Sequence, residues 1–229
     1  RLGTERICRI LSAVKMTDDC EVTLECNPEQ LTEQHLNNLK NTNFINRLSI
    51  GVQSFDNDDL KLLNRRHSCT DAINATKNAQ KAGFDNITLD LIYGIPGLTN
   101  NRWIENLNII ANLNIQHLSC YALTVEDGTM LKTLIDKGMI LPTDEDQALQ
   151  HYESLIKWCN NNNFSQYEIS NFCCEGYEAI HNSRYWDNTH YLGIGAAAHS
   201  YNGTSRQWNI SDIKTYIQSI NSNLVPATI

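Results

Sequence analysis

The sequence lacks several patterns that would assign it to common protein classes. No apolar run approaches the roughly 20 residues that a membrane-spanning helix needs, and no signal-peptide pattern opens the chain. It has no lysine or arginine cluster, and its formal charge is -8, which disfavours a general nucleic-acid binder. We therefore expect a cytoplasmic protein whose partners are small molecules or proteins, with no nucleic acid and no integral membrane segment.

The cysteines lack the spacing of a metal site. There are eight of them, but no two form a Cys-x2-Cys or Cys-x3-Cys pair, and only Cys173 and Cys174 lie close together. Adjacent residues do not supply the usual spacing of metal ligands. We expect reduced thiols, several of them buried as small hydrophobic side chains, and no metal site in this chain.

A repeated alternation of strand and helix is the main pattern that the sequence contains. Its 229 residues, 41% hydrophobic and 19% charged, suit one large globular domain. Units of about 30 to 40 residues with right-handed crossovers predict a parallel sheet, open or curved into a barrel. The predicted strands are residues 21–26, 47–52, 87–92 and 117–123, and the predicted helices are residues 4–14, 31–39, 58–64, 70–82 and 102–113.

Beyond residue 124 the alternation is less regular. Residues 126–142 predict an irregular excursion, and an amphipathic helix follows, with Thr143 and Asp146 as its capping box and the asparagines at 160–163 as its end. Residues 167–170 suggest one more strand. The glycines and alanines of residues 193–198 superficially resemble a dinucleotide loop, but no convincing βαβ unit accompanies them, so close backbone approach is the better interpretation.

Polar side chains stand at the ends of the four predicted strands. They are Glu25, Gln53, Asp90 and Thr124, one from each successive strand. In barrels the active site lies at the carboxyl ends of the strands. Each residue taken singly is better explained as structural, and Asp90 alone could simply bond to loop amides. The four together favour a shared ligand site.

The chemistry of these side chains suits a polar ligand. Glu25 and Asp90 could accept hydrogen bonds from ribose hydroxyls or an ammonium group, and Gln53 can both donate and accept. Arg65 could clamp a carboxylate. The alternative for Arg65 and Arg66 is a solvated helix end, where cations interact well with the helix dipole.

Several sequence blocks together resemble a known family. The resemblance is to the radical S-adenosylmethionine proteins of the oxygen-independent coproporphyrinogen III oxidase group, and most closely to the HemW heme chaperones. It implies an α/β fold, a partial (β/α)6 TIM-like barrel, with one core domain over residues 1–229. Barrel units three to six would lie in residues 1–124, and a HemW-type extension in residues 125–229. The blocks are residues 24–28, 47–55, 64–67, 90–97, 118–119, 167–170, 181–186 and 191–195.

The resemblance also implies roles for particular residues. It assigns S-adenosylmethionine to Glu25, Gln53, Arg65 and Asp90, with further backbone contacts from Thr124 and the region of His199. A second group resembles a signature of HemW-type members and could line a porphyrin-facing surface. The alternative for that group is a packed loop with a hydrogen-bonded histidine. Its members are His181, Asn182, Tyr185 and Trp186.

The sequence also departs from the family. The Cys-x3-Cys-x2-Cys strand that holds a [4Fe-4S] cluster and the glycine-rich second-strand loop are not in this chain, and Leu98 stands where a glutamine is common. We expect the first two barrel strands to be missing, the cluster to belong to a longer protein, and no radical chemistry from these residues alone. The sheet edge left exposed would favour dimerisation.

Three functions follow from the resemblance. The first is a heme chaperone that binds S-adenosylmethionine, a [4Fe-4S] cluster and heme, and hands heme to recipient hemoproteins. The second is an oxygen-independent coproporphyrinogen III oxidase, which starts oxidative decarboxylation with a 5′-deoxyadenosyl radical. The third is a degenerate barrel that serves only as an interaction module.

Overall fold

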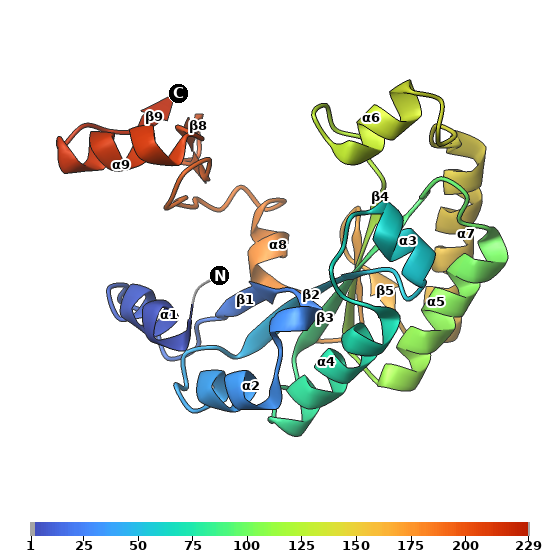
Figure 1. Cartoon of the computed structure of the whole chain (residues 1–229). Helices are drawn as coiled ribbons and strands as arrows, with labels where there is room; N and C mark the ends of the chain where they lie inside the picture. Colours follow the sequence, from blue (N-terminus) through green and yellow to red (C-terminus); the bar gives the residue numbers. More distant parts are fainter. Residues whose placement is uncertain (1–2, 229) are drawn as a thin grey trace. The chain divides into compact units, whose positions relative to one another are not determined.

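The computed structural model describes residues 3–228 and shows the α/β fold that the sequence predicted (Figure 1). Contacts separate the chain into two compact units, residues 1–178 and residues 179–229. Among the described residues, no helix has the length and apolar character needed to cross a membrane.

The first unit is built on a sheet of six strands. Their order is β1-β2-β3-β4-β6-β5; the first four are parallel, whereas β6 runs antiparallel to β4 and β5 antiparallel to β6. The four parallel strands confirm the predicted ones to within two residues at either end. The strands are β1 (Thr23–Cys26), β2 (Arg47–Gln53), β3 (Ile87–Tyr93), β4 (His117–Ala122), β5 (Ser165–Gln166) and β6 (Asn171–Cys173).

Helices connect these strands, and α2, α4, α5 and α7 follow one another along one side of the sheet (Figure 1). Several begin at the side-chain caps that the sequence offers: Thr32 caps α2, and Ser68 forms a capping box with Asp71 at α4. The helical elements are α1 (Thr4–Leu11), the 3-10 turn η1 (Pro28–Gln30), α2 (Glu33–Lys40), α3 (Asn57–Leu62), α4 (Cys69–Lys81), α5 (Asn100–Leu113), α6 (Met130–Asp136) and α7 (Glu145–Asn161).

The two faces of the sheet differ in polarity. One face packs Ile50, Leu89 and Leu118 into the core, where they are fully buried beneath helix residues such as Trp103 and Leu107. Side chains alternate along each strand, so the intervening residues form the opposite face. That face is polar, and its members are Thr23, Glu25, Arg47, Ser49, Thr88, Asp90, His117 and Ser119. Asp90 is therefore one member of a polar face, not an isolated carboxylate in a strand that is apolar on both sides.

The region after β4 differs from the sequence prediction. The expected excursion contains α6. The cap of α7 is Asp144 instead of Thr143, because the Asp144 carboxylate accepts the amide hydrogens of Asp146 and Gln147. The end of α7 in the asparagine run is confirmed, with Asn163 at a φ of 61°.

The predicted strand at residues 167–170 is wrong. This segment is the turn between β5 and β6, held by Glu168, whose Oε1 accepts from the Ser170 amide at 2.7 Å and from the Asn171 side chain at 2.5 Å. Because β6 returns to pair with β4, the chain after residue 125 completes the first sheet before the second unit begins. The single domain expected over residues 1–229 stays a prediction.

The second unit is a small antiparallel sheet with two helices. Gly193 allows the close backbone approach that the sequence suggested, since a Cβ there would lie 2.2 Å from the carbonyl oxygen of His199. The elements are α8 (Ile180–Arg184), β7 (His199–Tyr201), β8 (Arg206–Asn209), α9 (Ile213–Asn221) and β9 (Ala227–Thr228), with the strands in the order β7-β8-β9.

Candidate functional site

Three of the predicted site residues line one pocket on the polar side of the sheet. Glu25 lies on β1, Gln53 ends β2 and Asp90 lies on β3, and together they border a cavity of about 270 Å³. Parallel strands bring these positions together because their carboxyl ends share one edge. The remaining lining residues are Cys26, Asn27, Gln30, Ser49 and Gly51.

The pKa of the Asp90 carboxyl group in this pocket is raised to about 6, mainly by burial. The nearby Glu25 charge contributes to the rise, while hydrogen bonds from Ser119 and Ser49 and the charge of Arg47 oppose it. The Ser49 hydroxyl lies 3.2 Å and 3.3 Å from the two carboxylate oxygens. A cationic group placed beside Asp90 would favour its ionised form, so the pocket suits a positively charged ligand.

Cys26 lines the same pocket but is not a nucleophile there. Burial, together with the charges of the Asp90 and Glu25 carboxylates, raises the pKa of its thiol to about 12. A thiol of this kind stays protonated at neutral pH and contributes only a weak polar surface.

Gln53 is held in an unusual backbone conformation. Its φ is 72°, in the left-handed region that non-glycine residues rarely occupy, and the pairing of β2 with β3 shifts register between Ile50 and Gln53. Its side chain lies over Gly51, where a Cβ would approach the Gln53 amide nitrogen to 2.8 Å. The bulge therefore turns the Gln53 amide into the pocket, and Gly51 leaves room for it.

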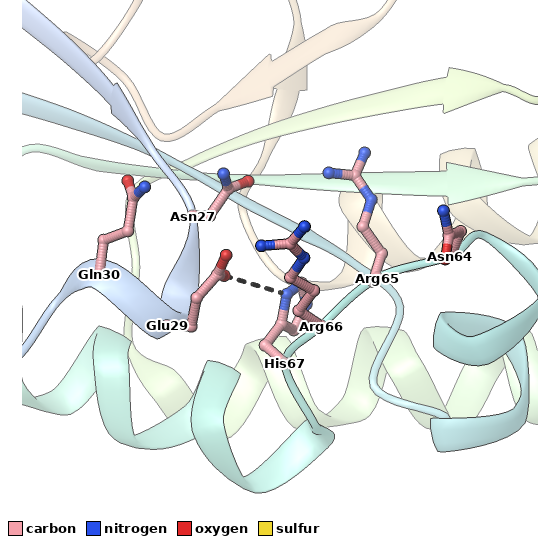
Figure 2. A pocket seen from close by; sticks show the side chains of 7 residues that line it. All are labelled: Asn27, Glu29, Gln30, Asn64, Arg65, Arg66 and His67. Atoms are coloured by element: carbon pink, nitrogen blue, oxygen red, sulfur yellow. Dashed lines mark ion pairs between the residues drawn. The ribbon is translucent and has the colours of Figure 1, made fainter. Parts of the chain in front are cut away.

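A second pocket contains Arg65 and adjoins the first (Figure 2). Its cavity is about 280 Å³, and it shares Asn27 and Gln30 with the Asp90 pocket. Arg65 follows α3, and its amide donates to the Leu60 carbonyl at 2.8 Å. Arg65 thus lines a cavity beside the carboxylate pocket, and its guanidinium can donate hydrogen bonds to an anionic group placed there.

Arg66 lines the second pocket too, and a buried histidine forms part of its wall. Figure 2 shows both guanidinium groups on the strand side of the loop, with Glu29 joined to His67. The His67 Nδ1 lies 3.7 Å from the Glu29 carboxylate, and its Nε2 lies 2.9 Å from the Val52 carbonyl oxygen. The histidine thus links η1, which carries Glu29, to β2 beneath the two arginines.

A hydrogen-bonded chain that the sequence analysis missed crosses the polar face one layer below the pocket. The Arg47 guanidinium donates to the Thr88 hydroxyl, which lies 3.1 Å from His117 Nδ1, and His117 Nε2 lies 2.8 Å from the Tyr167 hydroxyl. Burial, with the charge of Arg47, lowers the pKa of His117 to about 3, so the ring is neutral. Polar residues two positions before Ser49, Asp90 and Ser119 were the signal for this layer.

The other predicted residues lie outside both pockets. Thr124 is exposed two residues beyond β4, and His199 lies on β7 of the second unit, its ring 6.2 Å from that of Trp208. Leu98, at the position where a glutamine is common, is fully buried and contributes packing.

The second group of predicted residues lies together on and just after α8. The Nε2 of His181 is 2.9 Å from the Tyr185 hydroxyl, and the two rings meet edge to face. Tyr185 and Trp186 are exposed, and Asn182 is half-buried. The histidine is therefore hydrogen-bonded, while an aromatic surface beside it stays accessible.

The donor set fits one of the expected cofactors. The two adjoining pockets offer carboxylates, amides and guanidinium groups, which match the hydroxyls, ammonium and carboxylate of S-adenosylmethionine. Within residues 3–228, no three histidine, cysteine or acidic side chains are grouped so that they could hold a metal ion. The described residues therefore provide no ligand set for an iron-sulfur cluster.

Comparisons with known proteins identify the family. The family model of the radical SAM superfamily matches residues 2–110. The heme chaperone HemW of Bacillus subtilis is 38% identical over 204 residues, which are 89% of this chain and 54% of that protein. The chain contains a radical SAM domain. Members of this superfamily use S-adenosylmethionine and a [4Fe-4S] cluster.

Further relatives of this radical SAM chain agree. The heme chaperone HemW of Mycobacterium tuberculosis (strain ATCC 25618 / H37Rv) is 33% identical over 229 residues, 98% of this chain and 58% of that protein. A mitochondrial radical S-adenosyl methionine domain-containing protein 1 of Bos taurus is 35% identical over 190 residues, 83% of this chain and 43% of that protein. The chain thus spans only about half the length of the curated relatives it matches.

A solved structure confirms the radical SAM fold. Coproporphyrinogen III oxidase (HemN) from Escherichia coli superposes with a TM-score of 0.81 and covers 99% of this chain, which corresponds to 55% of that enzyme. The two sequences are 21% identical, so this likeness concerns the fold alone.

Proposed function

We propose that this chain is the S-adenosylmethionine-binding core of a heme chaperone of the HemW type. In the complete protein it would bind S-adenosylmethionine, a [4Fe-4S] cluster and heme, and would hand heme to recipient hemoproteins. The similarity to HemW proteins of several bacteria supports this function. The single observation that carries it is the pocket shared by Glu25, Gln53 and Asp90, which continues into the Arg65 pocket.

The two pockets present opposite charges to different parts of the ligand: one offers the Arg65 guanidinium, and the other the Glu25 and Asp90 carboxylates. Arg65 would bind the methionine carboxylate through two parallel hydrogen bonds from its planar guanidinium. Glu25 and Asp90 would accept hydrogen bonds from ribose hydroxyls or an ammonium group, and Gln53 would add an amide. When bound, S-adenosylmethionine together with a cluster supplies one-electron chemistry. The residues of this chain bind and orient the ligand.

The accessible aromatic surface after α8 supports a porphyrin-facing role. Tyr185 and Trp186 expose ring surface that a flat apolar ligand can cover, and His181 and Asn182 supply polar groups beside it. We include these four residues in the proposed heme-facing surface. We also propose that the protein acts in the cytoplasm. The alternative compartment is the mitochondrion, because one relative is mitochondrial.

Self-association of residues 1–229 by themselves is a further part of the proposal. Among the described residues, β1 pairs with β2 alone, which leaves its other edge open to another strand. Light scattering on the chain tests this: a dimer is expected, and a monomer at high concentration would reject it.

Binding of S-adenosylmethionine to the complete protein tests the proposed site. We expect Asp90→Asn to weaken binding about tenfold or more, because a charge-assisted hydrogen bond is lost. Asp58→Asn is the matched control, since Asp58 is exposed on α3 and lines neither pocket. Because the pKa of Asp90 is raised to about 6, affinity should increase as the pH rises from 5 to 7 in the wild type and not in Asp90→Asn. Equal affinity of the Asp90 variant and the wild type, measured by calorimetry, would reject the site.

Heme transfer tests the function of the complete protein. With its cluster reconstituted, it should bind hemin and pass it to an apo-hemoprotein, which absorption spectra can follow. No hemin binding and no transfer would reject the chaperone. Formation of protoporphyrinogen with turnover would instead show an oxidase.

A further inference from the structure

Arg102 contacts two loops that come from different strands. It lies in the first turn of α5, and its Nη2 is 2.7 Å from Asp56 Oδ1 and 2.6 Å from Asp59 Oδ1. Its Nε donates to Asp56 Oδ2 at 3.2 Å, so Asp56 is bound through both oxygens. Its Nη1 donates to the Gly97 carbonyl at 3.3 Å. One side chain thus joins the chain after β2 to the chain after β3.

The first of these loops carries the strained Gln53. The Ser54 hydroxyl, directly after it, donates to Asp59 Oδ2 at 2.9 Å, and the Phe55 amide donates to Asn106 Oδ1 at 2.9 Å. Ser54, Asp59 and Asn106 are all buried. A left-handed backbone at a glutamine persists only where the surroundings hold it. These bonds to α3 and α5 supply that support, and Arg102 anchors Asp59.

The second loop extends the strand that carries Asp90. Gly94 and Gly97 have φ values of 72° and 78°, and the Gly94 amide donates to His151 Nδ1 at 3.2 Å. At its far end, the Gly97 carbonyl is bound by Arg102. The loop is therefore fixed to α7 at its start and, through Arg102, to the Gln53 loop at its end.

We propose that Arg102 is a positioning residue that locks the loop of residues 53–56 to the loop of residues 94–98, and so sets the spacing of Gln53 and Asp90 across the pocket. Its planar guanidinium satisfies two carboxylates and a carbonyl at once, which no other side chain can do with the same geometry. For its effect on ligand binding, the inference rests on the proposed function. The locking of the two loops does not depend on it.

Hydrogen exchange of the complete protein tests the lock directly. In Arg102→Gln, amide exchange should speed up by about tenfold in both loops together, because opening either one no longer breaks bonds to the other. Asp56→Asn, which keeps a capping side chain for α3, should show a smaller increase in both loops. It also serves as the test if Arg102→Gln does not fold. Faster exchange in one loop alone, or in neither, would overturn the proposal.

Ligand affinity separates positioning from general stability. Arg102→Gln should weaken S-adenosylmethionine binding by about tenfold. Ile110→Val removes a methyl group from the buried face of the same helix, and Lys61→Gln removes an exposed charge; neither should change affinity or loop exchange. Wild-type affinity in Arg102→Gln would overturn the positioning role. If the wild type itself does not bind S-adenosylmethionine, the proposed function fails, and the exchange result still decides whether Arg102 locks the loops.

Discussion

The two units of the chain differ in how far their apolar side chains are buried. In residues 3–178, the sheet and its helices enclose a continuous core that includes Leu48, Leu89, Trp103 and Phe172. In residues 179–228, no leucine, isoleucine, valine, phenylalanine or tryptophan is buried. Hydrophobic burial is the main favourable contribution to folding. The first unit therefore has the means to fold alone, and the second does not.

Polar and aromatic contacts hold the second unit together instead. Tyr191 meets the ring of Tyr185 at 4.9 Å and that of Tyr201 at 6.1 Å, and the Asn209 side chain donates to the Gly195 carbonyl at 2.8 Å. Each such contact adds little net stability in water, because the unfolded chain bonds to water equally well. The second unit also exposes apolar residues, such as Ile213 on α9, whereas the first unit mostly encloses its apolar residues in its core.

Separating the two units should have the largest effect. Residues 1–178 expressed alone should unfold cooperatively in urea, because their core lies wholly within them. Residues 179–229 expressed alone should show no cooperative transition, as followed by circular dichroism. A sharp urea transition in the second fragment would contradict the comparison.

Truncating one tryptophan in each unit should give the next largest difference. Trp103→Ala should lower the free energy of unfolding by about 3–5 kcal/mol, because Trp103 is fully buried and its Nε1 donates to the His151 carbonyl at 2.8 Å. Trp208→Ala should cost under about 1 kcal/mol, because Trp208 is 45% exposed. Chemical denaturation of the whole chain measures both, and equal losses would show that the second unit is packed as tightly as the first.

The contributions of two aspartates to stability should change with pH in opposite directions. These effects should be smaller than those of the fragments and of Trp103→Ala. Burial raises the pKa of Asp90 to about 6, so the folded state binds its proton more tightly than the unfolded state. The contribution of Asp90 to the free energy of unfolding therefore falls as the pH rises from about 4 to 6, by on the order of 3 kcal/mol. Asp90→Asn should remove that loss.

Asp187 provides the contrast in the second unit. Hydrogen bonds from Thr189 and Arg184 lower the pKa of this exposed carboxyl group to about 2. Its contribution to stability is present above pH 4 and is lost as the pH falls toward 2. Carbon-detected NMR titration of the two carboxyl groups checks both directions; a normal pKa at Asp90 would contradict the pocket's burial.

Much of the first unit could be predicted from local patterns. The strands and helices up to residue 123 follow from hydrophobic periodicity and from caps such as Thr32, whose effects act over a few residues. Glu25, Gln53 and Asp90 were found because parallel strands align their carboxyl ends. The cap at Asp144 and the turn at residues 167–170 were missed, because neighbouring residues offered equally good local signals.

The alternating strands, their order along the chain and the residues at their ends are properties of short segments, which is why they could be identified without a structure. Other features could not be identified in this way, because each joins residues that lie far apart in the sequence. They are the pairing of β6 with β4, the hydrogen-bonded chain from Arg47 to Tyr167 and the bridge made by Arg102. Such contacts depend on how the crossovers place one strand beside another. The folded sheet alone decides which polar groups meet, and so turns single residues at strand ends into adjoining pockets.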